Sequence, residues 1–113
     1  MPDLIAQGAR PEHRWRRSLP PRQAIVIGRA GTWAVEWDRQ ISRQHAEICW
    51  KHGRLQVRCL PDAANPVFLR GKATNQFFLK PGEQFVIGGT VFTLADEKVK
   101  VAAGEASPVT EQS

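Results

Sequence analysis

Hydrophobic and polar residues alternate along most of this chain in short runs, each bounded by residues that favour turns. Residues 23–27 form an apolar, β-branched run that ends at Gly28, and residues 33–37 place three large apolar side chains on one face. Patterns of this kind predict β-strands. Further strands are expected at residues 13–19, 46–50, 55–59, 67–69, 75–79, 84–87, 90–94 and 98–101.

The region between Pro20 and Leu94 contains no segment with the apolar stripe of a long helix. Many short strands separated by turn residues favour an all-β fold, an antiparallel β-sandwich. We expect one domain at residues 11–101, after a flexible lead-in at residues 1–10 that has no periodicity. Residues 102–113 are small and polar, which is typical of a disordered tail or of the start of a linker to further domains.

The turn at residues 51–54 predicts a hairpin whose register can be stated. Matching the apolar faces of the two flanking runs places Ile48 opposite Val57, and Trp50 opposite Leu55. Cys49 and Cys59 then lie on opposite faces of the sheet, so a disulfide between them is not expected. Free cysteines agree with a reducing compartment.

Charge and composition restrict the location and the partner. The 113 residues carry a net charge of +5, which favours an anionic partner. The chain has no membrane-spanning apolar run, no signal-peptide pattern and no metal-type Cys or His spacing, so we expect a cytoplasmic protein without a cofactor. The basic run from Arg14 to Arg22 leaves nucleic acid open on charge alone, but a solvated sheet edge explains it more simply.

Two short motifs at strand ends carry the candidate chemistry. Gly28-Arg29 follows one apolar run, and Ser42-Arg43-Gln44-His45 precedes the next. An arginine offers a planar fork of donors that suits a phosphate group. We therefore expect the two motifs to meet and to hold a phosphorylated partner. His45 could instead act as a base for Ser42, but no carboxylate is evidently placed to orient it and no nucleophile elbow surrounds Ser42, so we do not expect an enzyme.

Four segments in register resemble the forkhead-associated (FHA) domain family. They are Gly28-Arg29, residues 42–48, residues 65–71 and residues 81–88, followed by Phe92. The resemblance covers the chain from about Ala24 to Leu94. It implies a sandwich of about eleven short strands, with a phosphothreonine-binding site formed by loops at one end. The implied function is recognition of a phosphothreonine-containing protein or peptide in signalling, as a module of a larger protein.

The resemblance also implies a role for each residue of the site. Arg29, Ser42 and Arg43 would bind the phosphate. Gly28 and His45 would support the site structurally. Asn65 would hydrogen-bond the main chain of the bound peptide, and Arg70 occupies the position of the family's second peptide-binding asparagine.

The chain departs from the family pattern around Asn65. Pro66 and Val67 stand where the family usually has glycine and threonine, and Ala64 replaces a hydroxyl residue that can touch the phosphate. These changes leave open whether peptide binding is weakened or re-specified. They motivate an alternative function, phosphate-independent assembly or oligomerisation by a degenerate FHA domain.

Overall fold

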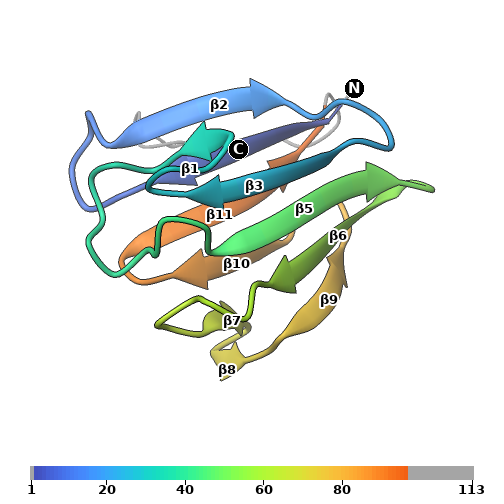
Figure 1. Ribbon diagram of the computed structural model, residues 1–113. Coiled ribbons are helices and arrows are strands. Elements are labelled where there is room, and N and C mark those ends of the chain that lie inside the picture. The colour runs from blue at the N-terminus through green and yellow to red at the C-terminus, as the bar shows by residue number, and fades with distance from the viewer. Residues whose placement is uncertain (1, 97–113) are drawn as a thin grey trace.

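The computed structural model describes residues 2–96, which form a sandwich of two β-sheets (Figure 1). A six-stranded antiparallel sheet has the order β2-β1-β11-β10-β7-β8, and a five-stranded sheet has the order β4-β3-β5-β6-β9. The expected all-β sandwich is confirmed. The five-stranded sheet is mixed, because β4 runs parallel to β3. The eleven strands are β1 Asp3–Gln7, β2 Arg14–Ser18, β3 Ala24–Gly28, β4 Trp33–Ala34, β5 Ala46–Lys51, β6 Arg54–Cys59, β7 Val67–Leu69, β8 Lys72–Ala73, β9 Gln76–Leu79, β10 Gln84–Ile87 and β11 Thr90–Ala95.

The start of the chain corrects the expected flexible lead-in at residues 1–10. Residues 3–7 form β1, which pairs with β2 on one side and with β11 on the other. Leu4 and Ala6 have no exposed surface, and Ile5 has 3%. The apolar triplet is too short to show a period, but burial between two partner strands stabilises it as a strand. The domain therefore begins before residue 11.

The central hairpin has the predicted register. In the pairing of β5 with β6, Ile48 lies opposite Val57, and Trp50 lies opposite Leu55. Cys49 pairs with Gln56, whereas Cys59 pairs with Ala46, and both cysteines are free. The apolar faces of the two strands select this register because a slip by one residue would turn every buried side chain toward solvent.

The other strand predictions hold with small changes. The basic strand β2 is an edge strand, as expected, while β4 covers only the first two residues of the predicted 33–37 run. Strand β8 was not predicted. The strand expected at residues 98–101 and the tail expected at residues 102–113 lie outside the described residues.

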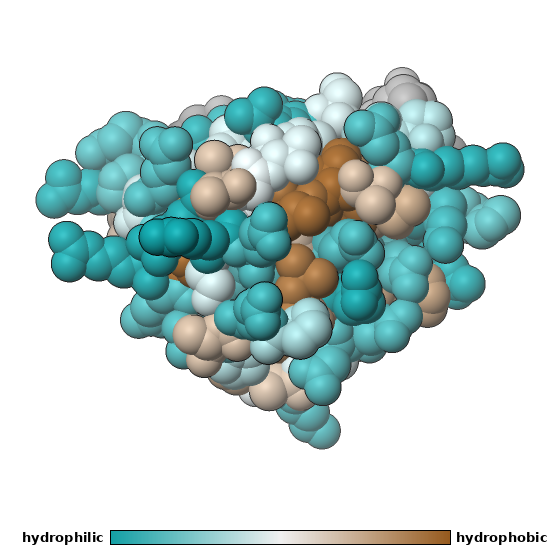
Figure 2. Space-filling view, viewed as in Figure 1, coloured by the Kyte–Doolittle hydropathy of each residue, from teal (hydrophilic) through white to brown (hydrophobic). Residues whose placement is uncertain are grey.

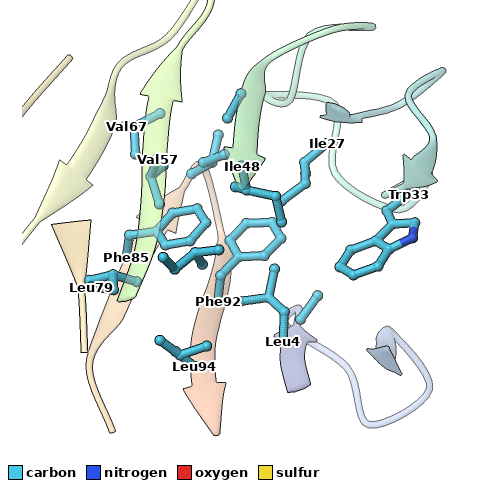
Figure 3. Packing of buried hydrophobic residues seen from close by; sticks show 14 of the residues in the cluster. Leu4, Ile27, Trp33, Ile48, Val57, Val67, Leu79, Phe85, Phe92 and Leu94 are labelled. Atoms are coloured by element: carbon cyan, nitrogen blue, oxygen red, sulfur yellow. The ribbon is translucent and has the colours of Figure 1, made fainter. Parts of the chain in front are cut away.

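The hydrophobic core fills the space between the sheets (Figure 3). Phe85 and Phe92 stack with ring centroids 4.8 Å apart, and Phe77 meets Phe85 edge to face at 5.9 Å. Ile27 and Ile48 pack into the core from the five-stranded sheet. Aromatic pairs of this geometry stabilise a core beyond the area that they bury, so they help to hold the two sheets together.

The loops after β3, β4 and β6 gather at one end of the sandwich, on the left in Figure 1, together with the turn between β10 and β11. Figure 2 shows that the visible face is largely hydrophilic, with a small hydrophobic patch near its centre. Within residues 2–96 there is no helix of a length and apolarity that would cross a membrane, and no group of three potential metal ligands.

Candidate functional site

The two sequence motifs lie against each other at this end of the sandwich. The backbone N–H of Arg29 donates to the carbonyl of Ser42 at 3.0 Å, and the N–H of Ala30 donates to the carbonyl of Arg43 at 3.0 Å. Gly28 makes this approach possible. A Cβ atom on Gly28 would overlap the carbonyl oxygen of Arg43 and would lie 2.8 Å from that of Ser42. The glycine therefore supports the site by allowing two backbones to meet.

Arg29 is exposed, and its side chain is partly fixed. Its Nε atom donates to the carbonyl of Ile41 at 2.7 Å. Among the residues that the structure describes, no group bonds its two terminal nitrogens. An arginine held in this way keeps part of its donor fork for a ligand, and it loses less side-chain entropy when the ligand binds.

His45 is buried beneath the loops and connects them. Its Nδ1 atom accepts a hydrogen bond from the backbone N–H of Ser42 at 2.9 Å, and its Nε2–H donates to the carbonyl of Asn65 at 2.8 Å. This arrangement requires the neutral ring with the proton on Nε2. Burial lowers the pKa of His45 below its ordinary 6.5, while the bond to Asn65 and the charge of Asp38 oppose that shift. At neutral pH the ring is therefore a brace for Ser42 and Asn65.

Ser42 and Asn65 are also joined to their surroundings through their side chains. The Ser42 hydroxyl oxygen accepts a hydrogen bond from the N–H of Ala64 at 2.9 Å, and Asn65 Nδ2 donates to the carbonyl of Gln40 at 2.8 Å. Because the serine oxygen acts as an acceptor, its own O–H can donate to a ligand. Because the amide nitrogen of Asn65 already donates to Gln40, Oδ1 is the atom of this side chain that can accept a hydrogen bond from a ligand.

A pocket of about 410 Å³ lies beside these groups. Its walls are Ala30, Ser42, Arg43, Gln44 and Asp62. The side chain of Arg43 is exposed, and within residues 2–96 it forms no ion pair or hydrogen bond. Ser42, which carries a hydroxyl, and Arg43, which carries a guanidinium, thus line the same cavity.

Arg70 is not brought together with the other predicted residues. It lies in the turn between β7 and β8, and its guanidinium binds Glu83 at 2.7 Å. Glu83 precedes β10, whereas the site loops contact Gly89, which follows β10. The two positions are at opposite ends of that strand.

Sequence reasoning missed Asp38, which fixes the loop between β4 and β5. Its carboxylate accepts hydrogen bonds from the N–H of Gln40 at 3.0 Å, the N–H of Gly89 at 2.8 Å and the hydroxyl of Thr90 at 2.9 Å. An aspartate that begins a polar loop often bonds the backbone two residues ahead, so the contact with Gln40 was foreseeable. The contacts with Gly89 and Thr90 join segments far apart in the sequence.

Comparison with known proteins bears on the fold and on the family of the chain. The family model of the FHA domain matches residues 17–88. The FHA domain of the CT664 protein from Chlamydia trachomatis superposes with a TM-score of 0.69 at 22% identity, covering 83% of this chain and 97% of that one. The Slr1951 protein from Synechocystis sp. gives 0.74 at 16% identity, with 86% and 99% covered.

An FHA domain from a structural and functional analysis of phosphothreonine-dependent FHA domain interactions gives a TM-score of 0.66 at 16% identity, with 84% and 97% covered. A search of curated protein sequences returns no match. At these identities the structural likenesses establish the fold, while the family model establishes the family.

Proposed function

Because the chain belongs to the FHA domain family, we propose that it binds phosphothreonine-containing segments of other proteins and so mediates phosphorylation-dependent contacts in signalling. One observation carries the proposal. Within residues 2–96, three hydrogen-bond donor groups on loops that are joined to one another have no acceptor. They are the terminal nitrogens of Arg29, the hydroxyl of Ser42 and the guanidinium of Arg43. Donors of this kind suit a phosphate dianion.

Asn65 completes the proposed site. With its amide bonded to Gln40, its Oδ1 can accept a main-chain N–H of the ligand, which would orient the peptide beside the phosphate. A peptide-binding role for Arg70 remains a prediction, and it would require the ion pair with Glu83 to open. The family further suggests that a small pocket for the threonine methyl group distinguishes phosphothreonine from phosphoserine.

The affinity follows from the number of bonds. Each charge-assisted hydrogen bond contributes about 1.5–3 kcal/mol. Three or four such bonds, reduced by the cost of ordering a flexible peptide, give roughly −8 kcal/mol, which is micromolar. Because the second phosphate pKa is near 6, binding should weaken below about pH 6, and it should also weaken with added salt.

The contact between Ser42 and His45 argues against a catalytic pair. The imidazole Nδ1 accepts the backbone N–H of Ser42, and its Nε2 is bonded to a carbonyl, so neither nitrogen faces the serine hydroxyl. A base must lie within hydrogen-bond reach of the proton that it removes. We therefore propose an interaction module rather than an enzyme.

The test is a peptide array in matched forms, each sequence carrying phosphothreonine, phosphoserine, threonine or glutamate. We expect the wild-type protein to retain the phosphothreonine form, and Arg29→Ala to lose that retention by about tenfold or more, the value of one charge-assisted bond. Lys51→Ala removes the same charge at the far end of β5, and it should bind like the wild type.

Equal retention of phosphorylated and unphosphorylated peptides would contradict the proposal. It would favour the alternative, phosphate-independent assembly, which the changed residues after Asn65 suggest. Nucleic-acid binding would appear instead as a steep salt dependence that survives Ser42→Ala.

A further inference from the structure

The pocket beside Ser42 contains an acidic side chain that phosphate recognition does not explain. Asp62 forms part of the pocket wall and is the acidic residue of its lining. The rest of the lining is Ser42, Arg43 and two further residues. A carboxylate near a phosphate site is unfavourable, because like charges at short range repel each other. Its presence therefore indicates something about the ligand besides the phosphate.

Asp62 forms no ion pair within the described residues, although Arg43 lines the same pocket. Asp62 is exposed, and within residues 2–96 it takes part in no hydrogen bond. Most other acidic side chains of this part of the chain are bonded: Asp3 to Arg16, Glu12 to Arg10, Glu47 to Arg58, and Glu83 to Arg70. Asp62 is thus an unpaired carboxylate at a cavity wall.

The backbone around Asp62 is held in place. The N–H of Ala63 donates to the carbonyl of Leu60 at 3.1 Å, and the N–H of Ala64 donates to the hydroxyl oxygen of Ser42 at 2.9 Å. The same serine that would bind the phosphate therefore fixes the loop that carries the carboxylate. A ligand phosphate on Ser42 and a ligand cation on Asp62 would occupy neighbouring positions.

We propose that Asp62 and this pocket form a subsite for a lysine or arginine side chain of the ligand, close in sequence to its phosphothreonine. The inference rests on the proposed function, and it names the ligand class: a phosphothreonine peptide with an adjacent basic residue. The ligand cation pairs with Asp62 and removes the repulsion between that carboxylate and the phosphate. The volume of about 410 Å³ is large enough for a long side chain.

The expected selectivity is modest because the subsite is open to solvent. Exposed ion pairs contribute little, and the corresponding change in affinity is about two- to fivefold. Added salt should reduce it further. Phosphate binding sets the affinity, and the subsite discriminates among phosphorylated sequences.

The experiment measures fluorescence anisotropy with phosphothreonine peptides that share a neutral host sequence. A single lysine, glutamate or alanine is placed at each position within about three residues of the phosphothreonine, a reach of roughly 10 Å along extended chain. The proteins are the wild type, Asp62→Asn, Asp62→Lys, and Glu36→Gln as a control that removes an exposed charge outside the pocket. Thermal unfolding of each variant confirms that it is folded.

We expect at least one position at which lysine binds the wild type two- to fivefold more tightly than alanine, and alanine more tightly than glutamate. Asp62→Asn should abolish this order, Asp62→Lys should reverse it, and Glu36→Gln should keep it. Equal affinity for the three peptides in the wild type, or an order unchanged in Asp62→Asn, would overturn the subsite while phosphothreonine recognition stands. If no phosphorylated peptide binds the wild type, the proposed function fails and the subsite fails with it.

Discussion

Gly28→Ala is the sharpest perturbation that the site allows, because it adds one methyl group where two loops meet. The new Cβ would overlap the carbonyl oxygen of Arg43, lie 2.6 Å from its carbonyl carbon, and lie 2.8 Å from the oxygen of Ser42. These are backbone atoms, so no flexible side chain can move aside. The loop that carries Ser42 and Arg43 must shift.

Two effects of opposite sign decide the change in stability. Gly28 is not among the positive-φ residues, so its backbone conformation is one that alanine can adopt. Alanine also reduces the entropy of the unfolded chain, which stabilises the folded state by about 0.4–1 kcal/mol. The overlap costs about 1–3 kcal/mol, as overpacking does. The overlap is the larger effect. We expect a net loss of roughly 1–2 kcal/mol, which lowers Tm by about 5–15 °C in a domain of this size.

Binding should fall further than stability alone requires. A displaced Ser42 hydroxyl loses a charge-assisted bond to the phosphate, which corresponds to about a ten- to hundredfold weaker Kd at a temperature where the variant is folded. Thermal unfolding and anisotropy with a phosphothreonine peptide measure both quantities. Gly89→Ala is the control, since its Cβ would meet nothing closer than 3.7 Å. Wild-type Tm and wild-type Kd in Gly28→Ala would refute the role assigned to this glycine.

Two further predictions concern His45 and Arg70. Because burial lowers the pKa of His45, the unfolded chain takes up its proton first as the pH falls. The stability contributed by the neutral ring is therefore complete above about pH 6.5 and is lost as the pH falls toward the lower pKa of the folded state. Tm should decline from pH 7 to 5, with a flatter slope in His45→Gln; equal slopes would contradict this reasoning. Arg70 has φ +51° in the two-residue turn after β7, a conformation that asparagine tolerates better. Arg70→Asn should raise stability by up to about 1 kcal/mol after loss of the exposed ion pair with Glu83, measured by urea unfolding; a lower midpoint would show that the ion pair outweighs the strain.

Much of the fold could be predicted because local pattern and tertiary pairing agree in it. The hairpin of β5 and β6 is the best example, since alternation alone placed Ile48 opposite Val57. β1 could not be found in the same way. Three apolar residues, Leu4 to Ala6, show no period, and although β2 follows closely, the second partner strand, β11, lies almost a whole chain length away. The local pattern does not encode the burial of β1 between these two partners.

The same distinction between local and long-range information applies to the candidate site. Side-chain type and strand-end position were sufficient to bring Gly28-Arg29 beside Ser42, because backbone ends of paired strands must meet. The atoms that hold the site were not predictable, since the carbonyl of Ile41 that fixes Arg29 carries no residue-type signal. Asp38 was missed because its bonds with Gly89 and Thr90 span more than fifty positions.

The changed residues after Asn65 bear on which proposed function is preferable. Asn65 and Val67 are absent from the positive-φ positions, so this segment needs no glycine, and Pro66 can be accommodated with its fixed negative φ. Val67 is fully buried and pairs with Ile87, which anchors the segment from below. His45, buried beneath the loop, donates to the carbonyl of Asn65 and holds the loop at that residue. A loop anchored at Asn65 and at Val67 keeps Asn65 Oδ1 available to accept a hydrogen bond, so the departure from the family pattern would change the peptide contacts of the proposed site without removing the support of its loop. This favours a re-specified phosphopeptide module over a degenerate one.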